Sequence, residues 1–209
     1  MKNLEIHVIT DGKQTVEELT KQILRFHEEA DYIHIRERTK TASELMEIVS
    51  ILITGGVPKK KIVINDRVDA AILNDLFNIH LPGHSFSIEK VRKLRPSLRI
   101  GRSVHSLQEA IEAEEAGADY LLFGHVFTTN SKAGLAPRGI PQFAEICERI
   151  EIPVIAIGGM TPETVQKLSG LKAGGVAVMS YVMSNSEPRH ALREIKKSLT
   201  EVKSNEKAL

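Results

Sequence analysis

Histidine and arginine side chains follow several short apolar runs of the sequence, and these residue types can move protons or bind anions. His125 comes two residues after the apolar run 119–123 and is preceded by Gly124. Because an imidazole has an ordinary pKa near 6.5, it can take and return a proton at neutral pH. We predict that His125 is the catalytic proton carrier, although a histidine in an apolar setting is also often a satisfied structural residue.

Two arginines occupy alternate positions after Ile35, so Arg36 and Arg38 share a face if the strand continues. Guanidinium groups bind carboxylates and phosphates bidentately, which favours contact with an anionic ligand. The alternative is an ion pair on the surface with Glu37 or Glu29. Other polar residues also follow apolar runs and are expected to converge on the same place: His34, Asn65, Asp66, Arg67, Arg102, Ser103 and His105.

Glycines follow the seventh apolar run and precede the eighth. Gly158 and Gly159 lead directly into a helix start at Thr161-Pro162, and Gly174-Gly175 precede the run 176–180. Glycine lets the backbone approach a ligand closely, and N–H groups at a helix start carry partial positive charge. The pattern indicates a phosphate cradle; the alternative is that these glycines only permit tight turns.

A long polar loop at 128–139 is typical of a lid, and Lys132 within it could close over an anionic substrate. A merely solvated loop is the alternative. Asp66 could contribute to a Mg²⁺ site, but no carboxylate follows the fourth apolar run, where Ser85 stands. We therefore predict no metal ligand and no cofactor.

These residues need elements that hold them together, and apolar runs alternate regularly with stretches of helical periodicity. Eight strands are predicted at 4–9, 31–35, 61–64, 77–81, 98–101, 119–123, 153–156 and 175–178. Eight helices are predicted at 15–29, 41–54, 68–74, 87–94, 106–116, 140–150, 161–170 and 187–203. Strict alternation over this length favours an α/β fold of one domain, a (β/α)8 TIM barrel over residues 1–203, rather than an open doubly wound sheet. Residues 204–209 are expected to fray.

The composition argues against two classes of partner, nucleic acids and membrane surfaces. The 209 residues include 28 basic and 27 acidic side chains, so no charge excess is available for nucleic acid or a membrane surface. The single cysteine, Cys147, cannot form an intrachain disulfide, and the N-terminus shows no leader or membrane span. We expect a cytosolic protein.

Six segments resemble, in order and spacing, the landmarks of thiamin-phosphate synthases: 33–38, 64–69, 100–106, 120–127, 152–160 and 175–180. Such synthases typically have Gln-x-Arg-x-Lys after the second strand, an acidic Mg²⁺ ligand after the fourth and Gly-Pro after the sixth. This chain has His34-x-Arg36-x-Arg38, Ser85 and Gly124-His125 at these places. These departures look like the TenI-type thiazole tautomerases of the same superfamily.

That resemblance implies an isomerase of thiamine biosynthesis, which aromatises a carboxythiazolylidene ethyl phosphate by a proton shift through His125. It implies that the phosphorylated thiazole is held at its phosphate by Gly158, Gly159, Met179 and Ser180. The carboxylate would meet Arg36, Ser103 or Lys132, with Arg38 and Asn65 also contacting substrate. Two alternatives stay open: thiamin-phosphate synthase itself, and a phospho-ligand-binding regulatory protein without catalysis. A homodimer is a further expectation.

Overall fold

Runs rich in valine and isoleucine form eight short strands, in a computed structural model that describes residues 4–132 and 134–205. β-branched residues suit strands because their stiff side chains pack well on a pleated surface. The strands are β1 (Glu5–Ile9), β2 (Tyr32–Ile35), β3 (Ile62–Asn65), β4 (Asn78–Leu81), β5 (Arg99–Val104), β6 (Tyr120–Gly124), β7 (Val154–Ile157) and β8 (Gly175–Val178).

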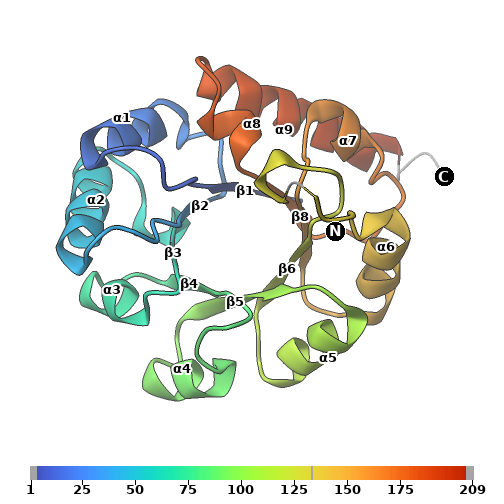
Figure 1. The fold of residues 1–209 in the computed structure, drawn as a ribbon, viewed down its shortest axis with the longest axis horizontal. Helices are drawn as coiled ribbons and strands as arrows, with labels where there is room; N and C mark the ends of the chain where they lie inside the picture. Colours follow the sequence, from blue (N-terminus) through green and yellow to red (C-terminus); the bar gives the residue numbers. More distant parts are fainter. Residues whose placement is uncertain (1–3, 133, 206–209) are drawn as a thin grey trace.

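Each strand pairs in parallel with the next, and β8 pairs with β1, so the sheet closes into a barrel surrounded by helices (Figure 1). Gly175 stands opposite Glu5 at this seam. A Cβ at Gly175 would lie 2.1 Å from the carbonyl oxygen of Glu5, so only glycine lets the two strands approach. The predicted single-domain (β/α)8 barrel is confirmed.

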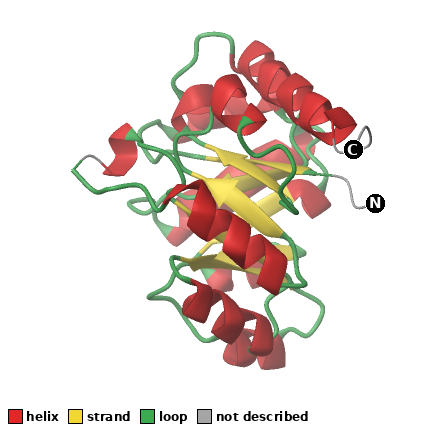
Figure 2. Cartoon of the chain, turned by 90° about the vertical axis from the view of Figure 1, so that its right-hand side faces the viewer, coloured by secondary structure: helices red, strands yellow, loops and turns green. Residues whose placement is uncertain are grey.

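Helices cover the outside of the barrel, with the strands enclosed between them (Figure 2). Threonine or serine caps begin several of them; Thr15 and Glu18, and likewise Thr41 and Glu44, form reciprocal capping boxes. The α-helices are α1 (Val16–Phe26), α2 (Ala42–Thr54), α3 (Val68–Leu73), α4 (Ile88–Leu94), α5 (Leu107–Glu115), α6 (Gly139–Arg149), α7 (Pro162–Gln166), α8 (Ser180–Met183) and α9 (Pro188–Asn205).

The elements differ from the prediction in a few places. β5 continues three residues beyond the predicted 101, α7 ends before the predicted 170, and the short α8 was not predicted. Two short 3-10 helices, Lys59–Lys61 and Asn130–Lys132, were also not predicted. α9 extends to Asn205, while residues 206–209 of the expected tail lie outside the described residues.

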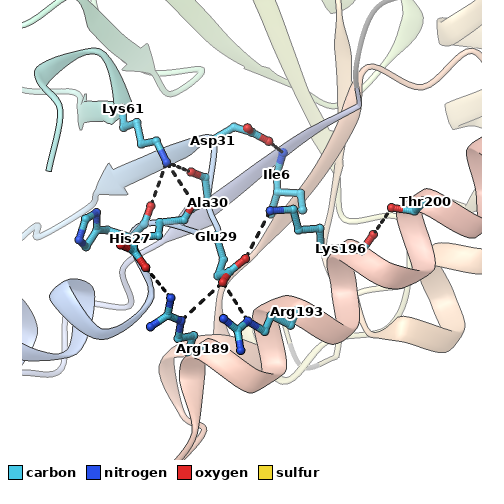
Figure 3. Close-up of polar contacts among 11 residues, drawn as sticks. Ile6, His27, Glu29, Ala30, Asp31, Lys61, Arg189, Arg193, Lys196 and Thr200 are labelled. Carbon is cyan, nitrogen blue, oxygen red and sulfur yellow. Dashed lines mark hydrogen bonds and ion pairs between the residues drawn. The ribbon is translucent and has the colours of Figure 1, made fainter.

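Charged contacts hold the last helix, α9, against the segment that follows α1 (Figure 3). Glu29, which follows α1, accepts from Arg193 Nε at 2.9 Å and from Lys196 Nζ at 3.3 Å, both on α9. Beside it, Lys61 Nζ donates to the carbonyl oxygen of Ala30 at 2.7 Å. These contacts tie α9 and Lys61 to the segment that leads from α1 into β2.

The barrel interior has a polar side and an apolar side. Inward positions of β6 to β8, together with Ile9, form a small apolar cluster of Ile9, Tyr120, Leu122, Ile155 and Ala177. Many inward positions of β1 to β5 instead carry polar, hydrogen-bonded side chains: Glu5, His7, His34, Asn65, His80, Arg99 and Ser103.

Among the described residues, no helix combines the length and apolar character needed to cross a bilayer.

Candidate functional site

A cavity of about 590 Å³ opens at the carboxyl ends of the strands. Its volume falls in the usual range of about 300–1,000 Å³ for small-molecule sites, and in a TIM barrel this end carries the active site. All ten residues predicted for the site line it: Arg36, Arg38, Asn65, Ser103, His125, Lys132, Gly158, Gly159, Met179 and Ser180. The roles given to them stay predictions.

The charge of the cavity lining has one sign. Two arginines, one lysine and four histidines contribute to it, and no aspartate or glutamate does among the described residues. A low-dielectric cleft lined by cationic groups concentrates anions, because the field is not screened by water as it is on an open surface. The cavity therefore suits a ligand with more than one negative group.

The two arginines of the β2 end are available for such a ligand. Neither guanidinium donates to any residue that the structure describes. The alternative of surface ion pairs is wrong, because Glu37 is buried against Lys40 at 3.0 Å and Glu29 binds α9. Burial, and then the neighbouring Arg38, lowers the pKa of Arg36, yet a guanidinium stays charged at neutral pH.

On the opposite side of the cavity, Gly158 and Gly159 have positive φ values of 98° and 68°. A Cβ at Gly158 would lie 2.3 Å from the His125 Cβ, and one at Gly159 would lie 2.5 Å from the Thr128 carbonyl oxygen. Close packing against the β6 loop therefore requires both glycines. The N–H groups of Gly159 and Ser180 donate to no described residue, which leaves them free for an anion.

His125 lies at the junction of these two sides. It is only 6% exposed, its Nε2 lies 3.2 Å from the carbonyl oxygen of Leu135, and its ring borders the cavity. The loop after β6 thus contacts His125 directly. In Figure 2 this loop, with its short 3-10 helix Asn130–Lys132, extends from the barrel on the side away from the N-terminus.

Three further histidines, His80, His84 and His105, line the cavity without having been predicted to bind substrate. His80 Nε2 lies 2.7 Å from Ser103 Oγ, and burial lowers the pKa of His80 to about 3, so it is neutral. His105 Nδ1 donates to the carbonyl oxygen of Gly124 at 2.7 Å. Alternation was the signal for His80: it stands two positions after Asn78 between apolar residues, as an inward-facing residue of a barrel strand must.

Several residues expected at the mouth lie elsewhere. His34 is fully buried inside the barrel. Arg67 pairs with Asp69, and Arg102 donates to the carbonyl oxygens of Gly83 and Phe86. These side chains follow strands as predicted, but local partners draw them away from the cavity.

The acidic donors do not fit a magnesium site of the synthase type. Asp66 does not line the cavity, and its carboxylate lies 4.0 Å from His84 Nε2. Ser85, where a second carboxylate is expected, has a buried hydroxyl with no partner within the described ranges. Within those ranges no group of three or more His, Cys, Asp or Glu side chains is arranged to hold a metal ion.

Comparison with known proteins identifies the family of this barrel. The model of the family described as thiamine monophosphate synthase matches residues 6–182. The chain belongs to this family. Thiamine-phosphate synthase of Chlorobium luteolum is 35% identical to it over 90% of this chain and 89% of its own length. The Pyrococcus horikoshii enzyme of that name is 33% identical over 96% and 97%.

The solved structure of a related protein supports this family assignment. Thiamine phosphate pyrophosphorylase from Pyrococcus furiosus superposes with a TM-score of 0.80 at 32% identity, covering 95% of this chain and 96% of that one. A 3-hexulose-6-phosphate synthase has a TM-score of 0.73 at 13% identity, over 93% of this chain and 99% of its own, and shows the fold alone.

The predicted isomerase activity is corrected by these relatives. The family was recognised correctly, but relatives that match most of the chain are thiamine-phosphate synthases by name, and such enzymes are transferases. The departures at His34, Arg38, Ser85 and His125 are local differences, whereas the similarity to synthases extends along the whole barrel. The alternative, a thiamine-phosphate synthase, fits the comparisons better.

Proposed function

We propose that this protein is a transferase of the thiamine-phosphate synthase type, which joins a pyrimidine diphosphate to a phosphorylated thiazole. The observation that supports it is the cavity of the family's barrel, lined by Arg36, Arg38 and Lys132 and by no described carboxylate. Such a lining suits two anionic substrates held at once. The free cysteine, Cys147, is buried, and we place the reaction in the reducing cytosol.

The reaction is a displacement at carbon. The thiazole ring nitrogen forms a C–N bond to the exocyclic carbon of the pyrimidine while the C–O bond to diphosphate breaks, and the electron pair leaves with the diphosphate. Negative charge develops on that leaving group. Fixed cations and N–H donors stabilise such charge strongly because they need no reorganisation during the reaction.

The residues divide by position in this proposal. The backbone N–H groups of Gly158, Gly159, Met179 and Ser180 bind the thiazole phosphate. Across the cavity, Arg36, Arg38 and Asn65 face the diphosphate, Ser103 contacts the pyrimidine ring, and Lys132 reaches the diphosphate from the loop after β6. His125, packed on Gly158 between the two, donates from Nε2 to the carbonyl oxygen of Leu135 and so holds the loop after β6 beside the site. Because the acidic donors do not fit a metal, no step is assigned to one.

Turnover with both substrates tests this function. Purified protein is incubated with the pyrimidine diphosphate and thiazole phosphate, with and without added Mg²⁺, and diphosphate release and thiamine phosphate are followed by ³¹P NMR and chromatography. We expect diphosphate and thiamine phosphate to form in equal amounts. The double variant R36A/R38A should lose most of the activity, whereas R67A, which alters an arginine paired outside the cavity, should retain it. Binding of both substrates without product in either condition would contradict the transferase and support the non-catalytic alternative.

A further inference from the structure

A chain of hydrogen-bonded side chains crosses the barrel interior and ends at the cavity. Glu5 Oε2 lies 2.9 Å from His7 Nε2, at the N-terminal end of the barrel. The other ring nitrogen, His7 Nδ1, lies 2.8 Å from His34 Nε2. His34 Nδ1 then lies 3.1 Å from the Oδ1 atom of Asn65, which lines the cavity. Both histidines are fully buried, so no water competes for these bonds.

The hydrogens of this chain can be counted. Asn65 Oδ1 only accepts, so His34 Nδ1 carries a hydrogen. The Glu5 carboxylate accepts two bonds from Arg99, at 3.0 and 2.9 Å, so it is ionised and His7 Nε2 also carries a hydrogen. The two remaining nitrogens face each other and need one hydrogen between them. Three hydrogens on four ring nitrogens make the pair a singly protonated bis-imidazole.

Rotation of one amide removes the need for that proton. If Asn65 presents its Nδ2 to His34, each ring needs only one hydrogen, and every bond in the chain is again satisfied. The two forms therefore differ by one proton and by the end of the Asn65 amide that faces the cavity. In the protonated form, with Oδ1 on His34, Asn65 Nδ2 donates to no described residue and is free to meet a ligand.

Other charged and titratable groups surround the pair. Burial lowers the pKa of His7 and of His34, which favours the neutral form, whereas Glu5 raises the pKa of His7 and favours the protonated one. The remaining groups that face the two rings are Tyr32, Tyr120, His80, Arg99 and Asp31. For both rings the lowering outweighs the raising, so the neutral form prevails at neutral pH and the protonated form is reached on the acid side of the ordinary histidine pKa.

We propose that His7 and His34 are positioning residues that hold one exchangeable proton, and that this proton decides whether Asn65 offers a donor or an acceptor to the cavity. With the proton in place, the amide NH2 group faces the ligand and suits an anionic oxygen. After its loss the carbonyl oxygen faces the same ligand and repels it. The use of diphosphate as the anionic probe rests on the proposed transferase function.

Nuclear magnetic resonance tests the coupling without any activity. In the full-length chain labelled with ¹⁵N, the ring nitrogens of both histidines and the side-chain amide of Asn65 are followed from about pH 4 to 8, because burial moves the midpoint below the ordinary histidine pKa near 6.5. We expect one shared midpoint for all three side chains. A pair that keeps one protonation state throughout, or an Asn65 amide that does not follow the pair, would overturn the proposal.

Substitution separates a proton switch from simple support. H34Q keeps hydrogen-bonding ends near the same place but cannot titrate, so the Asn65 signal should lose its pH dependence; H7Q is the second variant should H34Q not fold. Y32F, which retains the stacked ring 4.8 Å from His7, is the matched control and should titrate like the parent.

Binding of inorganic pyrophosphate gives the functional readout. Its affinity for the parent should fall about tenfold as pH rises through the midpoint, the worth of one charge-assisted hydrogen bond, and this step should be absent in H34Q. An unchanged step in H34Q would overturn the proposal. Absence of transferase turnover in every protein would instead count only against the proposed function, because the resonance titration stands apart from it.

Discussion

The two sides of the barrel interior bind through different chemistry. On the β1 to β5 side, side chains supply the polar groups, as with His80 on Ser103 and His34 on Asn65. On the β6 to β8 side the interior is apolar, and backbone N–H groups beside Gly159 and Ser180 are what remains for a ligand. One side of the site therefore depends on side-chain charge and hydrogen bonding, and the other on glycine and backbone shape.

Substitution on the glycine side should have the largest effect, a loss of folding stability. G158A places a Cβ 2.3 Å from the His125 Cβ in a backbone with φ of 98°, so we expect a loss of about 3 kcal/mol or more in unfolding free energy. Urea denaturation measures it. The matched control is G56A, whose φ of 92° is similar but whose new Cβ would meet nothing within 4 Å. A G158A loss no larger than that of G56A would contradict the packing argument.

The charged side should fail in binding rather than in folding. R36A removes a guanidinium that has no partner among the described residues, so stability should change little while pyrophosphate affinity falls about 10- to 100-fold, the usual worth of charge-assisted bonds. Calorimetric titration measures the affinity, with R67A as the control variant. If R36A and R67A bind equally well, Arg36 does not face the ligand.

The buried histidines of the polar side should make the protein sensitive to acid. Burial lowers the folded pKa of His80 to about 3, so below its ordinary value of 6.5 the unfolded chain binds a proton that the folded chain does not. Stability contributed by neutral His80 is therefore complete above about pH 6.5 and falls by about 1.4 kcal/mol per pH unit below it.

Urea midpoints between about pH 4 and 8 measure that slope, and H80N should reduce it by about one proton. Because Ser103 Oγ lies 2.7 Å from His80, H80N also lowers stability at neutral pH, so only the slope is decisive. Equal slopes in parent and variant would show that His80 does not take up a proton on unfolding.

The sequence predicted those features whose signals lie in neighbouring residues, and it missed those that depend on partners distant in the chain. Thr41 and Glu44 cap α2 through neighbouring atoms, so this helix start could be foreseen. Arg36 and Arg38 line the cavity as predicted, although β2 ends at Ile35 and strand alternation does not extend to them. Burial of His34 depends on strand register, which places it beside His7. Sequence spacing contains no such information about distant partners.

Similar limits apply to Arg102 and to α8. Arg102 turns from the cavity because two carbonyl oxygens of the β4 loop, at Gly83 and Phe86, lie within reach. The four residues of α8 are too few for any helical period to appear in the sequence. The predicted isomerase activity was also wrong, because it rested on local differences at His34, Arg38, Ser85 and His125, whereas similarity along the whole chain favours the synthases.

Lys132 should have the smallest effect, because it is exposed on the loop after β6 and reaches the cavity from solvent. Exposed charge pairs are worth about 0.2–1 kcal/mol, so K132A should weaken pyrophosphate binding only about two- to fivefold. That difference should disappear near 0.5 M salt, where the Debye length falls to about 4 Å. The matched control is K172A, whose lysine pairs with Glu148 and does not line this cavity. A K132A effect that persists at high salt would mean that Lys132 is enclosed with the ligand, and the lysine would then belong with Arg36 on the charged side.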